Sequence, residues 1–167
     1  MWWPDRRRVL VGAVALATVL AGCGYTPAYG PDGTSAIGRG AVAVEQASDR
    51  RTFLLREALI QRLGEPSSPA YALGLEVEVV AEGLGITANN EITRYQLVGT
   101  ARYTLRDLAT GSVATSGQVT GFTGYSTSAS TVGGVVARRD AEERLMTILA
   151  DRIAARLLGF DPGISGG

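Results

Sequence analysis

The sequence predicts an α+β two-layer sandwich in which two helices pack on a mainly antiparallel four-stranded sheet, in the order β-α-β-β-β-α. Three observations lead to this prediction. Two stretches carry apolar residues at helical spacing, long stretches alternate apolar and polar residues, and turns rich in Gly, Asp and Ser join the alternating stretches. We therefore expect one buried sheet face and one face that meets water.

The first two elements follow a linker rich in Pro and Gly. Residues 41–45 are expected to form a short strand. Ser48 is the expected N-cap of a helix over residues 49–63, and Gly64 is expected to end that helix. Its apolar side chains share one face that would lie on the sheet, namely Leu55, Ala58, Leu59 and Leu63.

Three long strands are expected next. Residues 71–79 alternate strictly between the two sides of a strand, and residues 94–106 carry a second long alternation of apolar and polar side chains. Between them, residues 81–91 are rich in Gly and Asn and predict a loose hairpin end. A turn over residues 107–111 leads to a third strand over 112–125. Three glycines in it fit either β-bulges or the close approach of another chain's backbone, and we expect bulges: Gly117, Gly121 and Gly124.

The last element is a helix after a loop of small residues over 126–134. Asp140 and Glu143 have the spacing of a capping box, although an earlier start is compatible with the pattern, and Gly159 is expected to end the helix. Five residues form its apolar stripe: Leu145, Ile148, Leu149, Ile153 and Leu157.

The beginning of the chain is typical of an export signal. An arginine triplet precedes an apolar run of about a dozen residues, shorter than the roughly 20 residues that a membrane-spanning helix needs. The following LAGC, which ends at Cys23, resembles the lipobox of bacterial lipoproteins. The resemblance implies cleavage before Cys23 and a covalent diacylglycerol and N-acyl lipid on it. The alternatives are an incidental buried cysteine and, for the arginine triplet, a twin-arginine export route.

These features divide the chain into four parts. We expect a removed signal peptide over residues 1–22, a flexible tether over 23–40, a single α+β domain over 41–160 and a disordered tail over 161–167. Without the signal peptide, thirteen arginines face fifteen acidic residues, which is a net charge of −2. This balance argues against nucleic acid as a partner.

Residue types that are missing exclude several kinds of catalytic site. The chain has no His, one Cys and no Lys, because all sixteen basic residues are Arg. It therefore has no imidazole base, no histidine-based metal site and no lysine for a Schiff base. We expect no catalytic residue and no bound metal.

Two stretches of the sequence resemble those of a known protein family. Residues 23–30, CGYTPAYG, resemble the opening of the mature LptE lipopolysaccharide-assembly lipoproteins, where Cys-Gly-aromatic is followed by Pro and then Tyr-Gly. Residues 140–157 are similar to the last helix of that family in the pairs DA and RL, the triplet LAD, an Ile and a second RL. The resemblance implies two helices on a four-stranded sheet.

The same resemblance implies a role. Proteins of this family are anchored to the periplasmic face of the outer membrane, and Gly24 after the cysteine fits outer-membrane sorting. They plug a large β-barrel partner, LptD, assist its assembly and help insert lipopolysaccharide into the outer leaflet. The implied partners are therefore an LptD-like barrel, lipopolysaccharide and, through the lipid, the membrane.

Lipopolysaccharide carries phosphates and acidic sugars, which arginine side chains can bind through charge-assisted hydrogen bonds. Three arginines fall on the polar side of the second long alternation and are the candidate contacts: Arg94, Arg102 and Arg106. The alternative is a solvated strand face without a function.

Two other functions remain open at this point. One is an auxiliary lipoprotein of a phospholipid or ABC-type envelope transport system, since such proteins share a lipid anchor and a small α/β domain. The other is a lipid-anchored hydrolase that uses carboxylates as acid and base. Its candidates would be Glu76, Glu78, Glu82 and Glu91, although a solvated carboxylate pair is the commoner explanation.

Overall fold

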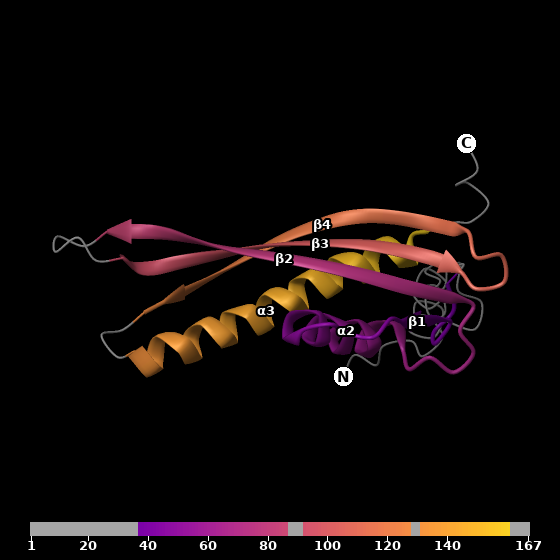
Figure 1. The fold of residues 1–167 in the computed structure, drawn as a ribbon, viewed down its shortest axis with the longest axis horizontal. Helices are drawn as coiled ribbons and strands as arrows, with labels where there is room; N and C mark the ends of the chain where they lie inside the picture. The colour runs from indigo at the N-terminus through magenta and orange to yellow at the C-terminus, as the bar shows by residue number, and fades with distance from the viewer. Residues whose placement is uncertain (1–36, 87–91, 128–130, 161–167) are drawn as a thin grey trace, which may run out of the picture. The chain divides into compact units, whose positions relative to one another are not determined.

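The computed structural model describes residues 37–86, 92–127 and 131–160 (Figure 1). The expected signal peptide, Cys23, Glu91 and the expected tail lie outside these ranges. In the described part, the elements in chain order are β1 (Val42–Val44), α2 (Arg50–Leu63), β2 (Tyr71–Ile86), β3 (Ile92–Asp107), β4 (Val113–Ser126) and α3 (Thr131–Leu158).

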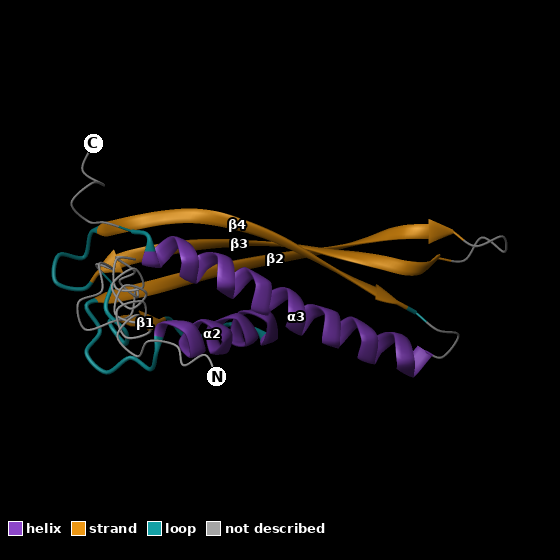
Figure 2. Ribbon diagram, turned by 180° about the vertical axis from the view of Figure 1, so that it is seen from behind, coloured by secondary structure: helices purple, strands orange, loops and turns teal. Residues whose placement is uncertain are grey.

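The four strands form one sheet in the order β1-β2-β3-β4. β2, β3 and β4 are antiparallel neighbours, whereas β1 pairs with β2 in parallel because α2 carries the chain back between them. Both helices lie against the same face of the sheet (Figure 2). The arrangement confirms the predicted two-layer α+β fold.

The N-cap of α2 is Asp49, so the prediction of Ser48 was wrong by one residue. The Asp49 carboxylate accepts hydrogen bonds from the backbone N–H groups of Arg51 and Thr52, at 2.7 and 3.0 Å. Either side chain can cap a helix, and the position of the first turn decides which one does. Gly64 ends the helix with φ of 88°, as expected.

α3 begins at Thr131, nine residues before the expected cap. Asp140 therefore lies inside the helix, where it pairs with Arg144 one turn later, and the capping-box prediction was wrong. Gly133 and Gly134 disfavour helix locally, but extending an established helix does not require a new nucleus. The expected loop over 126–134 was correspondingly too long.

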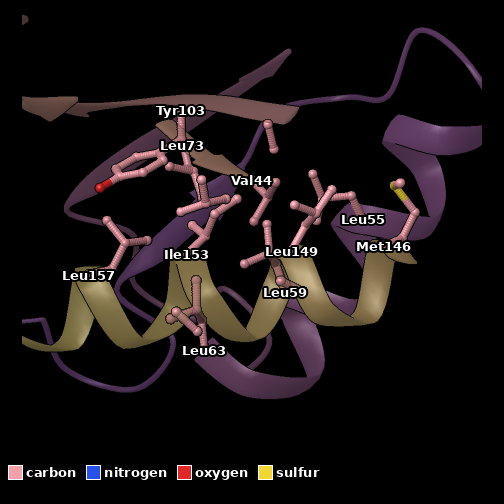
Figure 3. Packing of buried hydrophobic residues seen from close by; sticks show 14 of the residues in the cluster. Val44, Leu55, Leu59, Leu63, Leu73, Tyr103, Met146, Leu149, Ile153 and Leu157 are labelled. Carbon is pink, nitrogen blue, oxygen red and sulfur yellow. The ribbon is translucent and has the colours of Figure 1, made fainter. Parts of the chain in front are cut away.

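The core lies between the helices and the sheet (Figure 3). Leu55 and Leu59 of α2, Leu149 and Ile153 of α3 and Leu73 of β2 are fully buried in this cluster. Ile37, which precedes β1, is also buried in this core. Burial of one face of every element is what the alternating and helical patterns predicted.

The glycines of β4 do not mark bulges. The pairing of β3 with β4 shifts register only between Leu105 and Arg106, and Gly117, Gly121 and Gly124 lie in regular pairs. A Cβ at Gly117 would lie 2.6 Å from the Tyr103 hydroxyl oxygen, and one at Gly121 would lie 3.2 Å from Ile148 Cγ2. At these two positions glycine makes room for a ring and for α3, so the prediction of bulges was wrong.

The β2–β3 hairpin is longer than predicted. The expected loose end began at residue 81, but β2 continues to Ile86 and β3 begins at Ile92. Register shifts occur between Gly83 and Gly85 and between Gly85 and Ile86. The glycines here disturb the pairing of β2 with β3 but do not end it.

Candidate functional site: the open face of the sheet

No described element covers the face of β2, β3 and β4 that lies opposite the helices; we call it the open face (Figure 2). Even-numbered residues of β2 and β3 point to this face, because the buried residues Leu73, Leu97 and Leu105 are odd-numbered and side chains alternate along a strand. The open face therefore carries the polar half of both predicted alternations.

Arg102 and Arg106 line one hollow on the open face. The hollow has a volume of about 330 Å³ and lies near the start of β2. Its lining consists of Glu45, Gly74, Leu75, Glu76, Arg102, Thr104 and Arg106. Two of the three predicted arginines thus come together in one concave site.

Arg94 lies elsewhere on the same face. It pairs in register with Gly85 and Ser126, whereas Arg102 pairs with Glu76 and Gln118. Eight residues of extended strand place the backbones of Arg94 and Arg102 about 26 Å apart. The three arginines are therefore not one cluster.

The hollow combines both signs of charge. Glu45, just after β1, and Glu76 of β2 supply carboxylates beside the two arginines. Among the described residues, neither Arg102 nor Arg106 forms an ion pair within 4.0 Å. Both guanidinium groups are exposed and can donate several hydrogen bonds to an anionic ligand.

An apolar band crosses the open face farther along the strands. Val80, Val98 and Phe122 occupy one cross-strand row, and Val80 and Phe122 are 50% and 64% exposed. The alternation of residue types along each strand did not predict this band. Each of the three strands carries an apolar residue on its otherwise polar side. Only the register of the strands shows that these three side chains are neighbours.

The carboxylates considered for an enzyme do not form an enclosed site. Glu76, Glu78 and Glu82 are exposed on β2. In the described ranges no group of three His, Cys, Asp or Glu side chains could hold a metal ion. The same ranges contain no helix that is both long and apolar enough to cross a membrane.

The chain is similar to known proteins over the region just described. A family model described as LptE, lipopolysaccharide-assembly, matches residues 40–157, which include β1 and nearly all of α3. No curated protein matches the chain.

Solved structures share the fold, among them those of three lipoproteins. A candidate lipoprotein of Caulobacter crescentus is 24% identical with a TM-score of 0.62, and the match covers 73% of this chain and 91% of that one. The rare lipoprotein B of Shewanella oneidensis is 17% identical with a TM-score of 0.51, covering 71% and 92%. A minor lipoprotein of Acinetobacter baumannii is 16% identical with a TM-score of 0.50, covering 71% and 88%.

Proposed function

The chain belongs to the LptE family of lipopolysaccharide-assembly proteins, and on this premise we propose that it plugs and helps assemble an LptD-like β-barrel. At the level of the family it is an outer-membrane lipoprotein of lipopolysaccharide assembly, and the family is not catalytic. The observation that carries the proposal is the match over residues 40–157, which spans the two-layer domain.

The open face suits a plug. A folded domain inside a wet barrel needs one buried face to fold and another polar surface to meet the lumen. Here the helices bury one face of the sheet, and the open face carries Arg94, Arg102 and Arg106 among hydroxyl and amide side chains. The apolar band of Val80, Val98 and Phe122 supplies a local patch for contact with a partner.

Attachment to the periplasmic face of the outer membrane is assigned to a lipid on Cys23. This assignment is supported by the lipobox-like LAGC and by the arginine triplet and apolar run that precede it. Two or three acyl chains hold a protein durably, which one chain does not. Labelling of cells with a palmitate analogue should mark the wild type and fail to mark Cys23→Ala. A label that persists in Cys23→Ala would refute this assignment.

In this proposal the protein helps insert lipopolysaccharide by binding it directly at the hollow. Arg102 and Arg106 would bind phosphate or carboxylate groups there, and Arg94 would be a separate contact on the same face. Replacing Arg102 and Arg106 together by Gln should weaken lipopolysaccharide binding at least tenfold, since each charge-assisted hydrogen bond contributes roughly 1.5–3 kcal/mol. Arg139→Gln on α3, also exposed, is the matched control. Unchanged binding would mean that the arginines are only solvated.

The barrel partner is tested by affinity purification of the lipoprotein from solubilised outer membranes. We expect an LptD-like barrel in stoichiometric amount. Recovery of an envelope-spanning transporter complex without a barrel would instead favour the auxiliary transport function and overturn the proposal.

A further inference from the structure

The two edges of the sheet differ in how they are covered. At the β4 edge, three arginines of α3 donate hydrogen bonds to outward backbone carbonyls, namely Arg144 to Gly124, Arg152 to Thr120 and Arg156 to Gln118. At the other edge, β1 pairs only with residues 71–73 at the start of β2. Most of β2 extends beyond β1 (Figure 1).

The alternation of backbone groups shows which residues of β2 face outward. The carbonyl of Leu73 accepts a 3.0 Å hydrogen bond from the N–H of Glu45, on the β1 side. Backbone groups of alternate residues point to the same side of a strand. Four residues therefore direct their N–H and C=O groups away from β3, over about 20 Å: Leu75, Val77, Val79 and Ala81.

These groups have no partner among the described residues. Apart from the bonds to β3, no backbone hydrogen bond among the described residues reaches β2 beyond Leu73. A long edge of this kind is a template for another strand, unless charge, proline, a bulge or a covering element blocks it. Residues 74–82 contain no proline and pair with β3 without a register shift.

Side-chain charge decides what can pair there. Glu76, Glu78 and Glu82 project from β2 to the open face, and Glu45 lies beside Gly74 at the start of this row. A second copy of the chain paired antiparallel through β2 would place glutamates opposite or diagonal to glutamates, which is unfavourable. A strand with Arg or Lys at alternate positions would place a cation beside each glutamate.

We propose that the β2 edge, defined by the backbone of Leu75, Val77, Val79 and Ala81, binds an extended segment of a partner protein with basic side chains at alternate positions. Main-chain hydrogen bonds supply the binding, and the glutamate row sets register and selects charge. The proposal goes beyond the barrel assignment, because any partner with such a segment could occupy the edge.

The test uses the full chain in detergent and a peptide probe of about nine residues that alternates arginine and valine, a length suited to a strand of this span. A peptide that alternates glutamate and valine is the charge control. We expect at least tenfold preference for the basic peptide. On binding, amide exchange should slow at Leu75, Val77, Val79 and Ala81, while the amides of Glu76 and Glu78, already bonded to β3, change little.

Two variants sharpen the result. Val79→Pro removes one outward N–H without removing a bond to β3, so it should abolish binding, whereas Val79→Thr keeps the N–H and should bind. If Val79→Pro does not fold, the surface variant with both Glu76→Arg and Glu78→Arg tests the proposal by reversing the charge preference. Equal binding of both peptides, or binding without slower exchange at the four amides, would overturn it. So would self-association of the wild type through this edge.

Discussion

The guanidinium group of Arg156 on α3 donates a 2.8 Å hydrogen bond to the backbone carbonyl of Gln118 at the outer edge of β4. Arg152 and Arg144 do the same for Thr120 and Gly124. The spacing matches because four helical residues rise about 6.0 Å and two strand residues about 6.8 Å. The helix thus covers the carbonyls of an edge that would otherwise be free.

Replacing Arg144, Arg152 and Arg156 together by Met should increase self-association of the protein. Met keeps an apolar stem but donates no hydrogen bond, so three edge carbonyls become available to another chain. We also expect a loss of roughly 1 kcal/mol of stability per bond. Sedimentation velocity and chemical denaturation measure the two effects. Arg139→Met is the control, and a triple variant that stays monomeric would show that the arginines do not protect the edge.

Glu142 connects the two helices through three arginines. Its side chain is 11% exposed, and Arg51, Arg138 and Arg50 approach its carboxylate oxygens at 3.2, 3.4 and 3.7 Å. Arg138 is on the same helix, whereas Arg50 and Arg51 begin α2. The carboxylate therefore holds the N-terminus of α2 against the middle of α3.

Glu142→Gln should lower the free energy of unfolding by about 1–3 kcal/mol, because the nearly buried group loses its charge while the three arginines stay close together. The partial exposure of the arginines keeps the effect below that of a fully buried pair. Urea denaturation at low and high salt measures it, and the difference from the wild type should shrink as salt rises. Glu143→Gln, at an exposed neighbouring position, should be neutral. Equal losses in both variants would contradict this role of Glu142.

Alternation alone was enough to predict the strand faces. It placed Arg102 and Arg106 on the polar side of β3, where the structure finds them. The hollow could not be predicted, because it also needs Glu45, whose carboxylate approaches Gly74 only once β1 has paired with β2. Contacts between distant segments depend on register, which a local pattern does not contain.

The starts of the helices were the least predictable part of the fold. The spacing of Asp140 and Glu143 satisfies a capping box, yet the structure continues the helix back to Thr131. Two acidic residues at this spacing also occur inside helices. Here Asp140 lies inside α3 and pairs with Arg144 one turn later. Packing of α3 along β4, including the buried hydrogen bond from Thr123 Oγ1 to the Ala141 carbonyl at 3.0 Å, supports turns that local signals do not favour.

Gly99→Val should destabilise the protein by about 1–3 kcal/mol through overpacking. An ideal Cβ at Gly99 would lie 2.9 Å from Leu145 Cδ2 and 3.2 Å from Leu149 Cδ1, both in the core. The double variant with Gly99→Val and Leu145→Ala should lose less stability than the sum of the two single losses, as a double-mutant cycle by chemical denaturation can show. Gly124→Ala, where a Cβ would meet only the Tyr95 carbonyl at 3.7 Å, is the control. Additive effects of the two core substitutions would argue against a clash at Leu145.

The capping carboxylate of Asp49 should make stability depend on pH in the acid range. The backbone N–H of Thr52 holds the pKa of Asp49 below its ordinary value of 3.8, and the N–H and charge of Arg51 act in the same direction. A group whose pKa is lower in the folded state contributes stability above the unfolded pKa and loses it as pH falls through the folded pKa. The contribution of Asp49 should therefore be complete above about pH 5 and disappear below its folded pKa. Asp49→Ala should cost about 1 kcal/mol at neutral pH.

Asp49→Asn separates capping from charge. Asn caps a helix nearly as well but does not titrate, so this variant should keep most of the neutral-pH stability and show a shallower loss in acid than the wild type. The pKa of Asp107 is also lowered, chiefly by the backbone N–H groups of Thr110 and Ala109, so acid sensitivity that remains in Asp49→Asn is expected to include Asp107. Urea denaturation from neutral pH to below the ordinary aspartate pKa measures all three proteins. Parallel curves for the wild type and Asp49→Asn would show that the carboxylate charge contributes nothing at this helix end.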